Sequence, residues 1–246
     1  MLQTKIFLKY FTISVVLIFI ISVVFLSNKT LLFFFPDKIW AHKVNNIEKL
    51  EEASKKYAGI ELDVVFHKKT NSFDVNHPPD SSINLSLTEF FLSQKNSVSN
   101  CKYWIDFKNL DYENKKLSAD KLDSIANVFE IDKKNIIIES ISPKFLKLFD
   151  DKGFLTSYYL PTNLNLLDDK NLESVLKTIN TNISTFKNTY ISFNYKDYEI
   201  INRRFPYKKK LTWFTNYGSL NKISARILLF EISMDENVDI LLIPLK

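Results

Sequence analysis

The sequence predicts an α/β protein: a (β/α)8 TIM barrel of residues 37–246, preceded by an N-terminal transmembrane helix. After residue 37, about nine short apolar segments with strand character alternate with segments of helical periodicity. Some strand segments are apolar without interruption, as in Ile136, Ile137 and Ile138, which is typical of parallel strands covered by helices on both faces. The roughly 210 residues available are enough for one such barrel. A doubly wound sheet is the alternative architecture.

The expected elements follow one another mostly in strand–helix order. Strands are predicted at 38–41, 60–66, 73–76, 103–107, 136–139, 154–158, 190–193, 211–214 and 238–243. Helices are predicted at 46–57, 85–92, 118–128, 143–149, 168–183, 197–204 and 219–232. Nine strands are predicted, whereas the barrel needs eight. The pairing of the extra strand stays open, because residues 60–76 can form two barrel strands in tandem.

The first 36 residues have the pattern of a membrane anchor with a tether. Lys5 and Lys9 precede an uncharged apolar run at 10–26, and a membrane span needs about 17–25 residues. Basic residues before the run favour a cytoplasmic N-terminus. We therefore expect a single-pass membrane protein whose C-terminal domain is exported to the periplasm or the extracellular space. A cleaved signal peptide is the alternative, and it predicts a secreted protein.

Composition excludes several kinds of site. The three glycines are far apart, which excludes a P-loop and the glycine-rich dinucleotide fingerprint. Cys101 is the single cysteine, which excludes an internal disulfide and a cysteine-based zinc site. The 33 basic and 28 acidic residues give a formal charge of +5. This charge suits an anionic substrate, and it is far from the composition of a nucleic-acid-binding protein.

Carboxylates gather where the predicted strands end, which is where the active sites of (β/α)8 enzymes lie. Glu61 and Asp63 are two residues apart in one strand, so both side chains point to the same face. Asp106 and Lys108 have the same spacing in another strand. Three converging carboxylates repel one another unless a cation lies among them, and all-oxygen ligation suits Mg²⁺ or Ca²⁺. The sequence therefore predicts a metal site, with Lys108 as a fixed positive charge beside it.

His42 and His77 also fall at strand ends. An imidazole with its usual pKa of about 6.5 can act as an acid or a base near neutral pH. A metal, a lysine and two imidazoles together are the parts needed for attack on a phosphodiester: charge neutralisation, proton removal and proton donation. Glu139 ends the run of isoleucines, and two interpretations stay open for it: a side chain that points into the barrel, or a member of an interior ion pair.

The motifs around these residues resemble those of the phospholipase C-like phosphodiesterase superfamily. They are Ile-Trp-Ala-His42-Lys-Val-Asn45, Gly-Ile-Glu61-Leu-Asp63-Val-Val-Phe, His77-Pro-Pro, Trp-Ile-Asp106-Phe-Lys108 and Leu211-Thr-Trp213-Phe-Thr215-Asn216. The superfamily includes glycerophosphodiester phosphodiesterases, spider-venom sphingomyelinase D and the menorin proteins. The first two motifs look nearest to sphingomyelinase D and menorin, and the third looks like menorin. The last motif is similar to a late strand of the glycerophosphodiesterases.

The resemblance covers about residues 38–246 and implies a TIM barrel with a divalent cation, Mg²⁺ or Ca²⁺. The metal ligands that it implies are Glu61, Asp63 and Asp106. The catalytic residues that it implies are His42, His77 and Lys108, the histidines as the acid–base pair and the lysine as a cation on the phosphate side. The substrate-binding residues that we predict from these motifs are Asn45, Trp213 and Asn216.

The motifs support a catalytic core and leave the substrate open. Glycerophosphodiesterases follow the first histidine with Arg-Gly, whereas Lys43 and Val44 follow it here. We expect a phosphoric diester hydrolase or lyase that cleaves a glycerophosphodiester or a phospholipid-like headgroup. Either water or a neighbouring hydroxyl of the substrate can attack, and the sequence does not assign which histidine is the acid. The alternative is a catalytically inactive barrel that binds a phosphorylated glycan or lipid.

Overall fold

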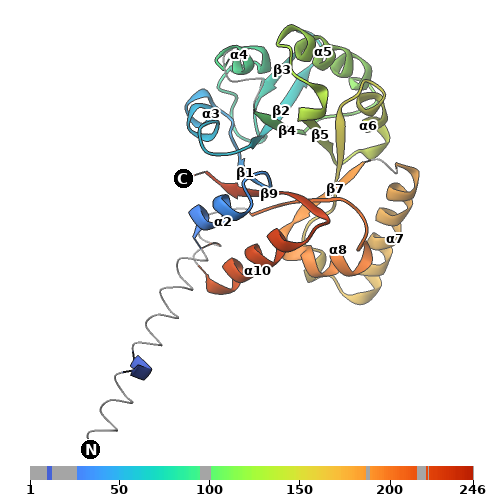
Figure 1. The fold of residues 1–246 in the computed structure, drawn as a ribbon. Coiled ribbons are helices and arrows are strands. Elements are labelled where there is room, and N and C mark those ends of the chain that lie inside the picture. The colour runs from blue at the N-terminus through green and yellow to red at the C-terminus, as the bar shows by residue number, and fades with distance from the viewer. Residues whose placement is uncertain are drawn as a thin grey trace, which may run out of the picture.

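Eight parallel strands in the described part of the chain close into a barrel, and helices cover its outside (Figure 1). The structure is a computed structural model that describes residues 10–12, 27–94, 101–186, 189–214, 220 and 222–245. Neighbouring strands follow the order β1-β9-β8-β7-β6-β5-β4-β2, and β1 pairs with β2 to close the ring. The predicted TIM barrel is confirmed, and the alternative of an open, doubly wound sheet is wrong.

The barrel strands lie close to their predicted positions. They are β1 (Ile39–His42), β2 (Gly59–His67), β4 (Lys102–Phe107), β5 (Ile136–Ser140), β6 (Leu155–Tyr159), β7 (Tyr190–Asn194), β8 (Lys210–Trp213) and β9 (Val238–Pro244). By contrast, β3 (Ser72–Val75) pairs antiparallel with the second half of β2. The idea of two barrel strands in tandem at 60–76 is therefore wrong, because these residues form a hairpin that extends one barrel strand.

Helices follow most of the barrel strands, and several begin at a residue that caps them. They are α2 (Asn28–Phe34), α3 (Ile47–Ala53), α4 (Leu87–Leu92), α5 (Lys115–Val128), α6 (Pro143–Asp150), α7 (Asp169–Thr185), α8 (Tyr198–Arg204) and α10 (Ile223–Met234). Asn46 accepts from the Lys49 amide at the start of α3, and Ser86 and Glu89 form a capping box on α4. Such caps satisfy amides that have no partner inside the helix.

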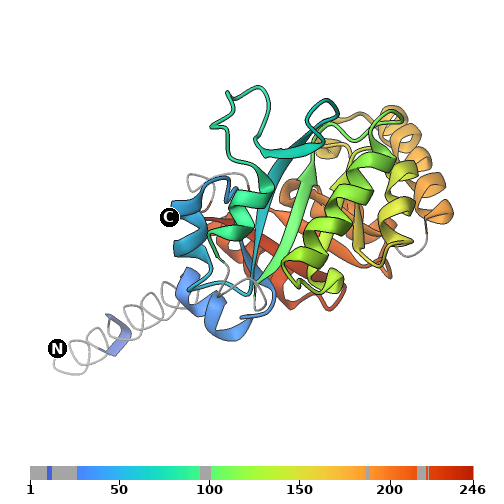
Figure 2. The same cartoon turned by 90° about the horizontal axis from the view of Figure 1, so that it is seen from above.

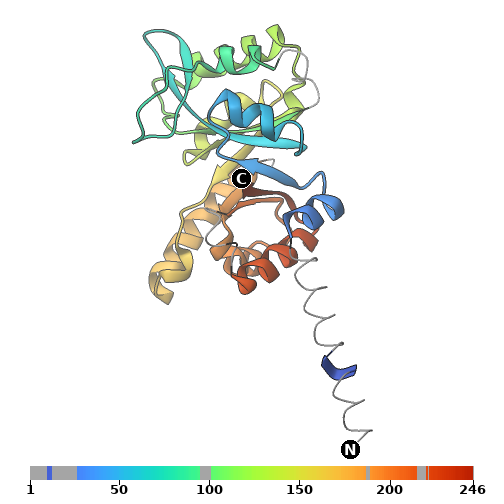
Figure 3. The same cartoon turned by 90° about the vertical axis from the view of Figure 1, so that its left-hand side faces the viewer.

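Helix α2 packs against the barrel beside α10 (Figures 1 and 3). Leu31 is 1% exposed, and the ring of Phe35 meets that of Phe230 at a centroid distance of 5.9 Å. Arg226 of α10 donates to the side chain of Asn28. The loop between β3 and α4 projects from the opposite end of the barrel (Figure 2).

The predicted single-pass topology with an exported C-terminal domain is contradicted. Within the described ranges, no helix is long and apolar enough to cross a membrane. Residues 13–26, which make up most of the apolar run behind that prediction, lie outside the described residues. The predicted transmembrane helix, and the membrane partnership through it, therefore have no support.

Apolar side chains fill the inside of the barrel. The buried residues of this interior cluster are Trp40, Trp104, Ile137, Leu211, Trp213, Ile240 and Leu242. Gly59 makes room for one of them, because a Cβ at this position would lie 2.4 Å from Cδ2 of Trp40. Carbon atoms prefer separations of about 3.5–4.0 Å. The barrel is thus a packed core, and residue 59 has to be glycine as long as Trp40 keeps its place.

Replacing Gly59 with alanine is expected to lower the free energy of unfolding by about 1–3 kcal/mol, the usual cost of overpacking a core. Urea denaturation of the wild-type and variant proteins measures this difference. In a Trp40→Leu background the same replacement should cost much less, because the ring that opposes the new methyl group is gone. An equal cost in both backgrounds would show that the contact with Trp40 is not the cause.

Candidate active site

The polar residues singled out in the sequence meet at the carboxyl ends of the barrel strands. Glu61 and Asp63 lie on β2, Asp106 lies on β4, and His42 is the last residue of β1. All four line one cavity of about 170 Å³, together with Lys108 and His77. The structure thus brings together every residue that was predicted to bind the metal or to take part in catalysis.

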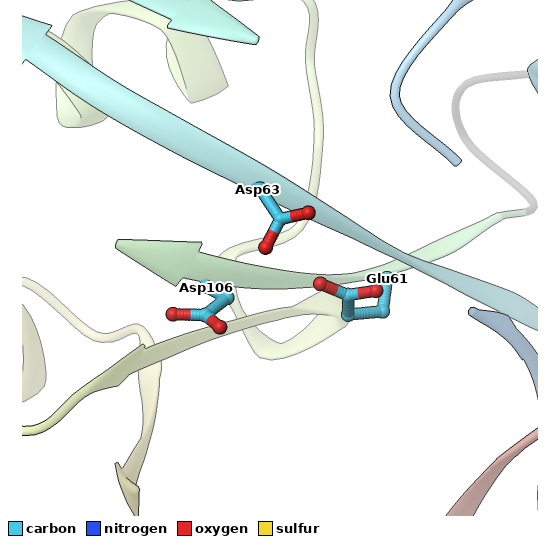
Figure 4. Close-up of side chains that lie close together, drawn as sticks. All are labelled: Glu61, Asp63 and Asp106. Atoms are coloured by element: carbon cyan, nitrogen blue, oxygen red, sulfur yellow. The ribbon is translucent and has the colours of Figure 1, made fainter. Parts of the chain in front are cut away.

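Three buried carboxylates form an acidic cluster in this cavity (Figure 4). Glu61, Asp63 and Asp106 are 3%, 1% and 8% exposed, and one oxygen from each lies within 4.8 Å of the others. Asp63 and Asp106 are direct neighbours in the parallel register of β2 and β4. Because alternate residues of a strand share a face, Glu61 joins them from the same strand as Asp63.

Lys108 compensates part of this negative charge. Its Nζ lies 2.7 Å from Oδ1 of Asp63 and also contacts Oδ2 of Asp106. Burial lowers the pKa of Lys108, but Asp106 and Asp63 outweigh this effect and the pKa is raised. The ammonium group is therefore fully charged at neutral pH, and the acidic cluster together with it keeps an excess of negative charge.

The excess charge is visible in the pKa values of two carboxyls. Burial, and then repulsion by Asp63 and Asp106, raise the pKa of Glu61 well above its usual value. Burial also raises the pKa of Asp106, with Lys108 opposing and Asp63 reinforcing the rise. A cation among the three oxygens would remove this repulsion, and carboxylate oxygens are the ligands preferred by Mg²⁺ and Ca²⁺. The acidic cluster therefore fits a divalent cation.

Backbone and amide groups fix the direction of two carboxylates. The Lys43 amide donates to Oε2 of Glu61 at 2.7 Å, and Lys43 has the uncommon left-handed backbone, with a φ of 57°. Nδ2 of Asn45 donates to Oδ2 of Asp63 at 2.6 Å, while the Asp63 amide donates to Oδ1 of Asn45 at 2.9 Å. Asn45 thus orients a carboxylate in this structure, and its predicted contact with substrate stays a prediction.

His42 presents one ring nitrogen to the cavity. Its Nδ1 lies 2.9 Å from the carbonyl oxygen of Phe214. Because a carbonyl can only accept, Nδ1 carries the proton and Nε2 is unprotonated in the neutral ring. Nε2 lies 3.7 Å from Oε2 of Glu61. Burial lowers the pKa of His42 to about 4, so the ring is neutral at pH 7 with its Nε2 lone pair facing the acidic cluster.

His77 reaches the cavity by a different route. It follows β3, which is not a barrel strand, and it stands at the start of the loop that leads to α4. The Asn76 amide donates to the Asp63 carbonyl at 3.1 Å, which ties the residue before His77 to β2. His77 is partly exposed and lies close enough to Asp106 to lower the pKa of that carboxyl.

Five further residues line the cavity that the sequence analysis did not assign to the site. They are Lys43, Trp104, Glu139, Tyr159 and Leu242. Tyr159 stacks on Trp213 with ring centroids 4.8 Å apart, so Trp213 lies at the cavity wall, as its predicted role requires. The alternation of side-chain directions along a strand could have identified Trp104 as a cavity residue, because it lies two residues before Asp106. Asn216 lies outside the described residues.

The structure gives the orientation of the Glu139 side chain, which the sequence left open. It is 2% exposed and lines the cavity, so its side chain points into the barrel. Burial and then Asp106 raise the pKa of Glu139 well above its usual value. No ion pair of Glu139 is present among the described residues. The interpretation as a member of an interior ion pair therefore has no support among these residues.

Comparisons with known proteins agree with the fold and with the motifs. A family model described as the menorin N-terminal domain matches residues 37–129. A glycerophosphodiester phosphodiesterase from Parabacteroides distasonis superposes with a TM-score of 0.55 at 16% identity, covering 83% of this chain and 91% of that one. A phosphodiesterase from Oleispira antarctica, solved with the product sn-glycerol-3-phosphate, gives 0.55 at 9% identity, covering 82% and 92%. A comparison with curated proteins returns no match.

The fold and the acidic cluster define the class: a closed (β/α)8 barrel similar to that of glycerophosphodiester phosphodiesterases. Residues 37–129, which hold the barrel strands β1, β2 and β4, match the menorin N-terminal domain. The predicted resemblance to the phospholipase C-like phosphodiesterase superfamily is therefore confirmed. At these identities the solved structures establish the fold alone.

Replacing Glu61 with glutamine is expected to stabilise the protein in a chelating buffer at pH 8. The pKa of Glu61 is raised in the folded state, so ionisation of this carboxyl favours the unfolded state once the pH rises above the unfolded-state pKa of 4.5. Below pH 4.5 the carboxyl is protonated in both the folded and the unfolded states, and the effect disappears. For a chain of this size each kcal/mol gained raises the melting temperature by about 2–4 °C.

Thermal denaturation at pH 8 and pH 4 measures this effect, with Glu48→Gln on the exposed surface of α3 as the matched control. Added Mg²⁺ or Ca²⁺ should raise the melting temperature of the wild-type protein more than that of the Glu61 variant. A Glu61 variant that is less stable than wild type at pH 8 would contradict the assignment of charge repulsion in the acidic cluster.

Proposed function

We propose that this protein is a metal-dependent phosphodiesterase that cleaves a small phosphodiester by acid–base catalysis with two histidines. One observation carries the proposal: a buried acidic cluster, a lysine and two histidines share one cavity at the carboxyl end of the barrel. Binding of a phosphate alone does not require a paired acid and base around a metal site. The likeness to the glycerophosphodiester phosphodiesterase fold supports the same class of reaction.

The metal would be held by Glu61, Asp63 and Asp106, whose all-oxygen ligand set suits Mg²⁺ or Ca²⁺. A bound divalent cation supplies charge neutralisation at the phosphate. Lys108 adds a second positive charge on the same side of the cavity and attracts the non-bridging phosphate oxygens. Asn45 and the Lys43 amide hold two of the three carboxylates in place.

His42 is the better candidate for the general base. Its pKa of about 4 keeps the ring neutral, and the Phe214 carbonyl fixes the tautomer that leaves Nε2 free to accept a proton. In the proposed step, Nε2 takes the proton of the attacking hydroxyl as the new O–P bond forms. The attacking hydroxyl belongs to water, or to the substrate itself, in which case the product is cyclic.

His77 is then the general acid. It lies on the β3–α4 side of the cavity, on a loop open to solvent, where an imidazole can regain a proton between turnovers. It donates a proton to the leaving oxygen as the P–O bond breaks. A cavity of about 170 Å³ suits a compact substrate such as a glycerophosphodiester or the headgroup of a larger lipid. Trp213, Asn45 and Asn216 are the proposed contacts to that substrate.

Replacing His42 or His77 with alanine is expected to lower kcat by about 100–10,000-fold without unfolding the protein, because each change removes one proton-transfer group. The assay follows hydrolysis of glycerophosphodiesters with Mg²⁺, Ca²⁺ or Mn²⁺ added to chelator-treated enzyme. His67→Ala is the matched control, since the His67 side chain is 54% exposed and does not line the cavity.

Turnover that requires the cation and falls in both site variants, but not in the His67 variant, supports the proposal. Unchanged turnover in His42→Ala would refute the proposed mechanism. Cation binding without turnover of any phosphodiester would instead favour the alternative, a barrel that binds a phosphorylated glycan or lipid.

The leaving group is expected to distinguish the acid from the base. A p-nitrophenolate leaves as a stable anion and needs little protonation, whereas an alkoxide needs a proton. His77→Ala should therefore lose at least tenfold more activity on an alkyl phosphodiester than on a p-nitrophenyl one, while His42→Ala loses similar factors on both. Paired kcat/KM values for the two substrates measure this, and the reverse pattern would exchange the two roles.

A further inference from the structure

Tyr159 lines the cavity, but the proposed mechanism gives it no role. It is the last residue of β6, and its side chain is partly buried. In the closed ring of strands, β6 lies four places from β1 in either direction. Tyr159 therefore approaches the cavity from the side opposite His42, which ends β1.

Neighbouring aromatic rings hold the Tyr159 side chain in place. Its ring stacks on that of Trp213, with centroids 4.8 Å apart and an angle of 28° between the planes. Trp213 in turn meets Trp104 edge-on with centroids 6.5 Å apart, and both tryptophans are buried. A side chain that is fixed before a ligand arrives loses little conformational entropy on binding. The Tyr159 hydroxyl is therefore a preorganised group at the cavity wall.

The hydroxyl of Tyr159 is available as a hydrogen-bond donor. Burial, and then the negative charge of Glu139, raise the pKa of Tyr159 to about 12, so the phenol keeps its proton at neutral pH. Asp106, Lys108 and Asp63 also act on this pKa, because the hydroxyl lies within electrostatic reach of the acidic cluster. In the part of the chain that the structure describes, no group forms a hydrogen bond with this hydroxyl.

Three other donors around the cavity already have acceptors within the protein. Nδ1 of His42 donates to a backbone carbonyl, and the Lys43 amide donates to a carboxylate of the acidic cluster. Nζ of Lys108 contacts two carboxylates of the same cluster. Tyr159, by contrast, presents a donor that is open to a ligand.

A phosphate oxygen is the acceptor that suits this donor. The acidic cluster and Tyr159 surround one cavity of about 170 Å³, so a phosphate held in it lies beside both. Non-bridging phosphate oxygens carry negative charge and form charge-assisted hydrogen bonds with such donors. A second ammonium group at this position would form an ion pair with the carboxylates, as Lys108 does, whereas a neutral phenol adds a donor without adding a charge.

We propose that Tyr159 is a substrate-binding residue whose hydroxyl donates a hydrogen bond to a non-bridging oxygen of the substrate phosphate. Lys108 and Tyr159 then contact the phosphate from different walls of the cavity and fix its orientation. This inference deepens the proposed function, on which it rests. Because it concerns the phosphate group itself, binding of inorganic phosphate can test it without turnover.

Calorimetric titration with inorganic phosphate in the presence of Mg²⁺ tests the proposal. Tyr159→Phe keeps the ring that stacks on Trp213 but lacks the hydroxyl. It should bind phosphate at least about tenfold more weakly than the wild-type protein, because a hydrogen bond to a charged group is lost. Its affinity for Mg²⁺ alone and its melting temperature should stay close to the wild-type values, because the three carboxylates and the stacked ring are unchanged.

Tyr158→Phe is the matched control. Tyr158 precedes Tyr159 on β6 and points to the opposite face of the strand, where its hydroxyl accepts a hydrogen bond from Asn182 of α7. This variant should bind phosphate with an affinity within about threefold of wild type. The proposal is overturned if Tyr159→Phe keeps the wild-type affinity, if the two variants lose equal affinity, if the affinity for Mg²⁺ falls together with that for phosphate, or if the wild-type protein binds no phosphate.

Turnover separates this proposal from the proposed function. A wild-type protein that binds phosphate through Tyr159 but cleaves no phosphodiester would reject the proposed function and leave the phosphate contact standing. Turnover that is lost in His42→Ala but has an unchanged kcat/KM in Tyr159→Phe would keep the proposed function and reject the contact.

Discussion

The site depends on one unfavourable interaction: three carboxylates are buried with one oxygen from each within 4.8 Å of the others. Like charges this close in a medium of low polarity repel strongly. The surrounding groups counter this repulsion. Lys108 contacts two of the carboxylates, the Lys43 amide donates to the third, and Asn45 pairs twice with Asp63. A fold that keeps such a cluster gives up stability, as functional sites often do.

The geometry of parallel strands produces the acidic cluster with few residues. A period of two directs Glu61 and Asp63 of β2 inward, and the register between β2 and β4 brings Asp106 beside Asp63. The packed interior below, which includes Trp40 and Trp104, keeps these strands at a fixed separation. The same register carries Glu139 into the next position around the ring. One structural rule therefore positions both the proposed metal ligands and Glu139 around the same cavity.

Local patterns made the barrel, the acidic cluster and both site histidines predictable, because strand alternation and strand ends can be recognised within a few residues. Properties that depend on distant partners were not predictable. The inward direction of Glu139 without a cationic partner, and the stacking of Tyr159 on Trp213, follow from pairing among strands that are far apart in the sequence. In the sequence, β3 looked like another barrel strand, because a strand of an antiparallel hairpin and a barrel strand have the same apolar pattern. The hydrogen bond from Asn45 to Asp63 was not predictable either, because a motif does not reveal which groups its side chains contact.

His77 follows a hairpin strand that is not part of the barrel ring, whereas His42 and the proposed metal ligands lie on barrel strands. The loop after β3 is closed at its base, where the Val75 amide donates to the Leu85 carbonyl at 2.8 Å and the Asn76 amide donates to the Asp63 carbonyl at 3.1 Å. Residues between these anchors can change in number at small entropic cost, because that cost grows only slowly with loop length. Evolution can therefore lengthen or shorten this loop, and so reshape the entrance beside His77 for new substrates, while β2 and β4 and the carboxylates on them stay as they are.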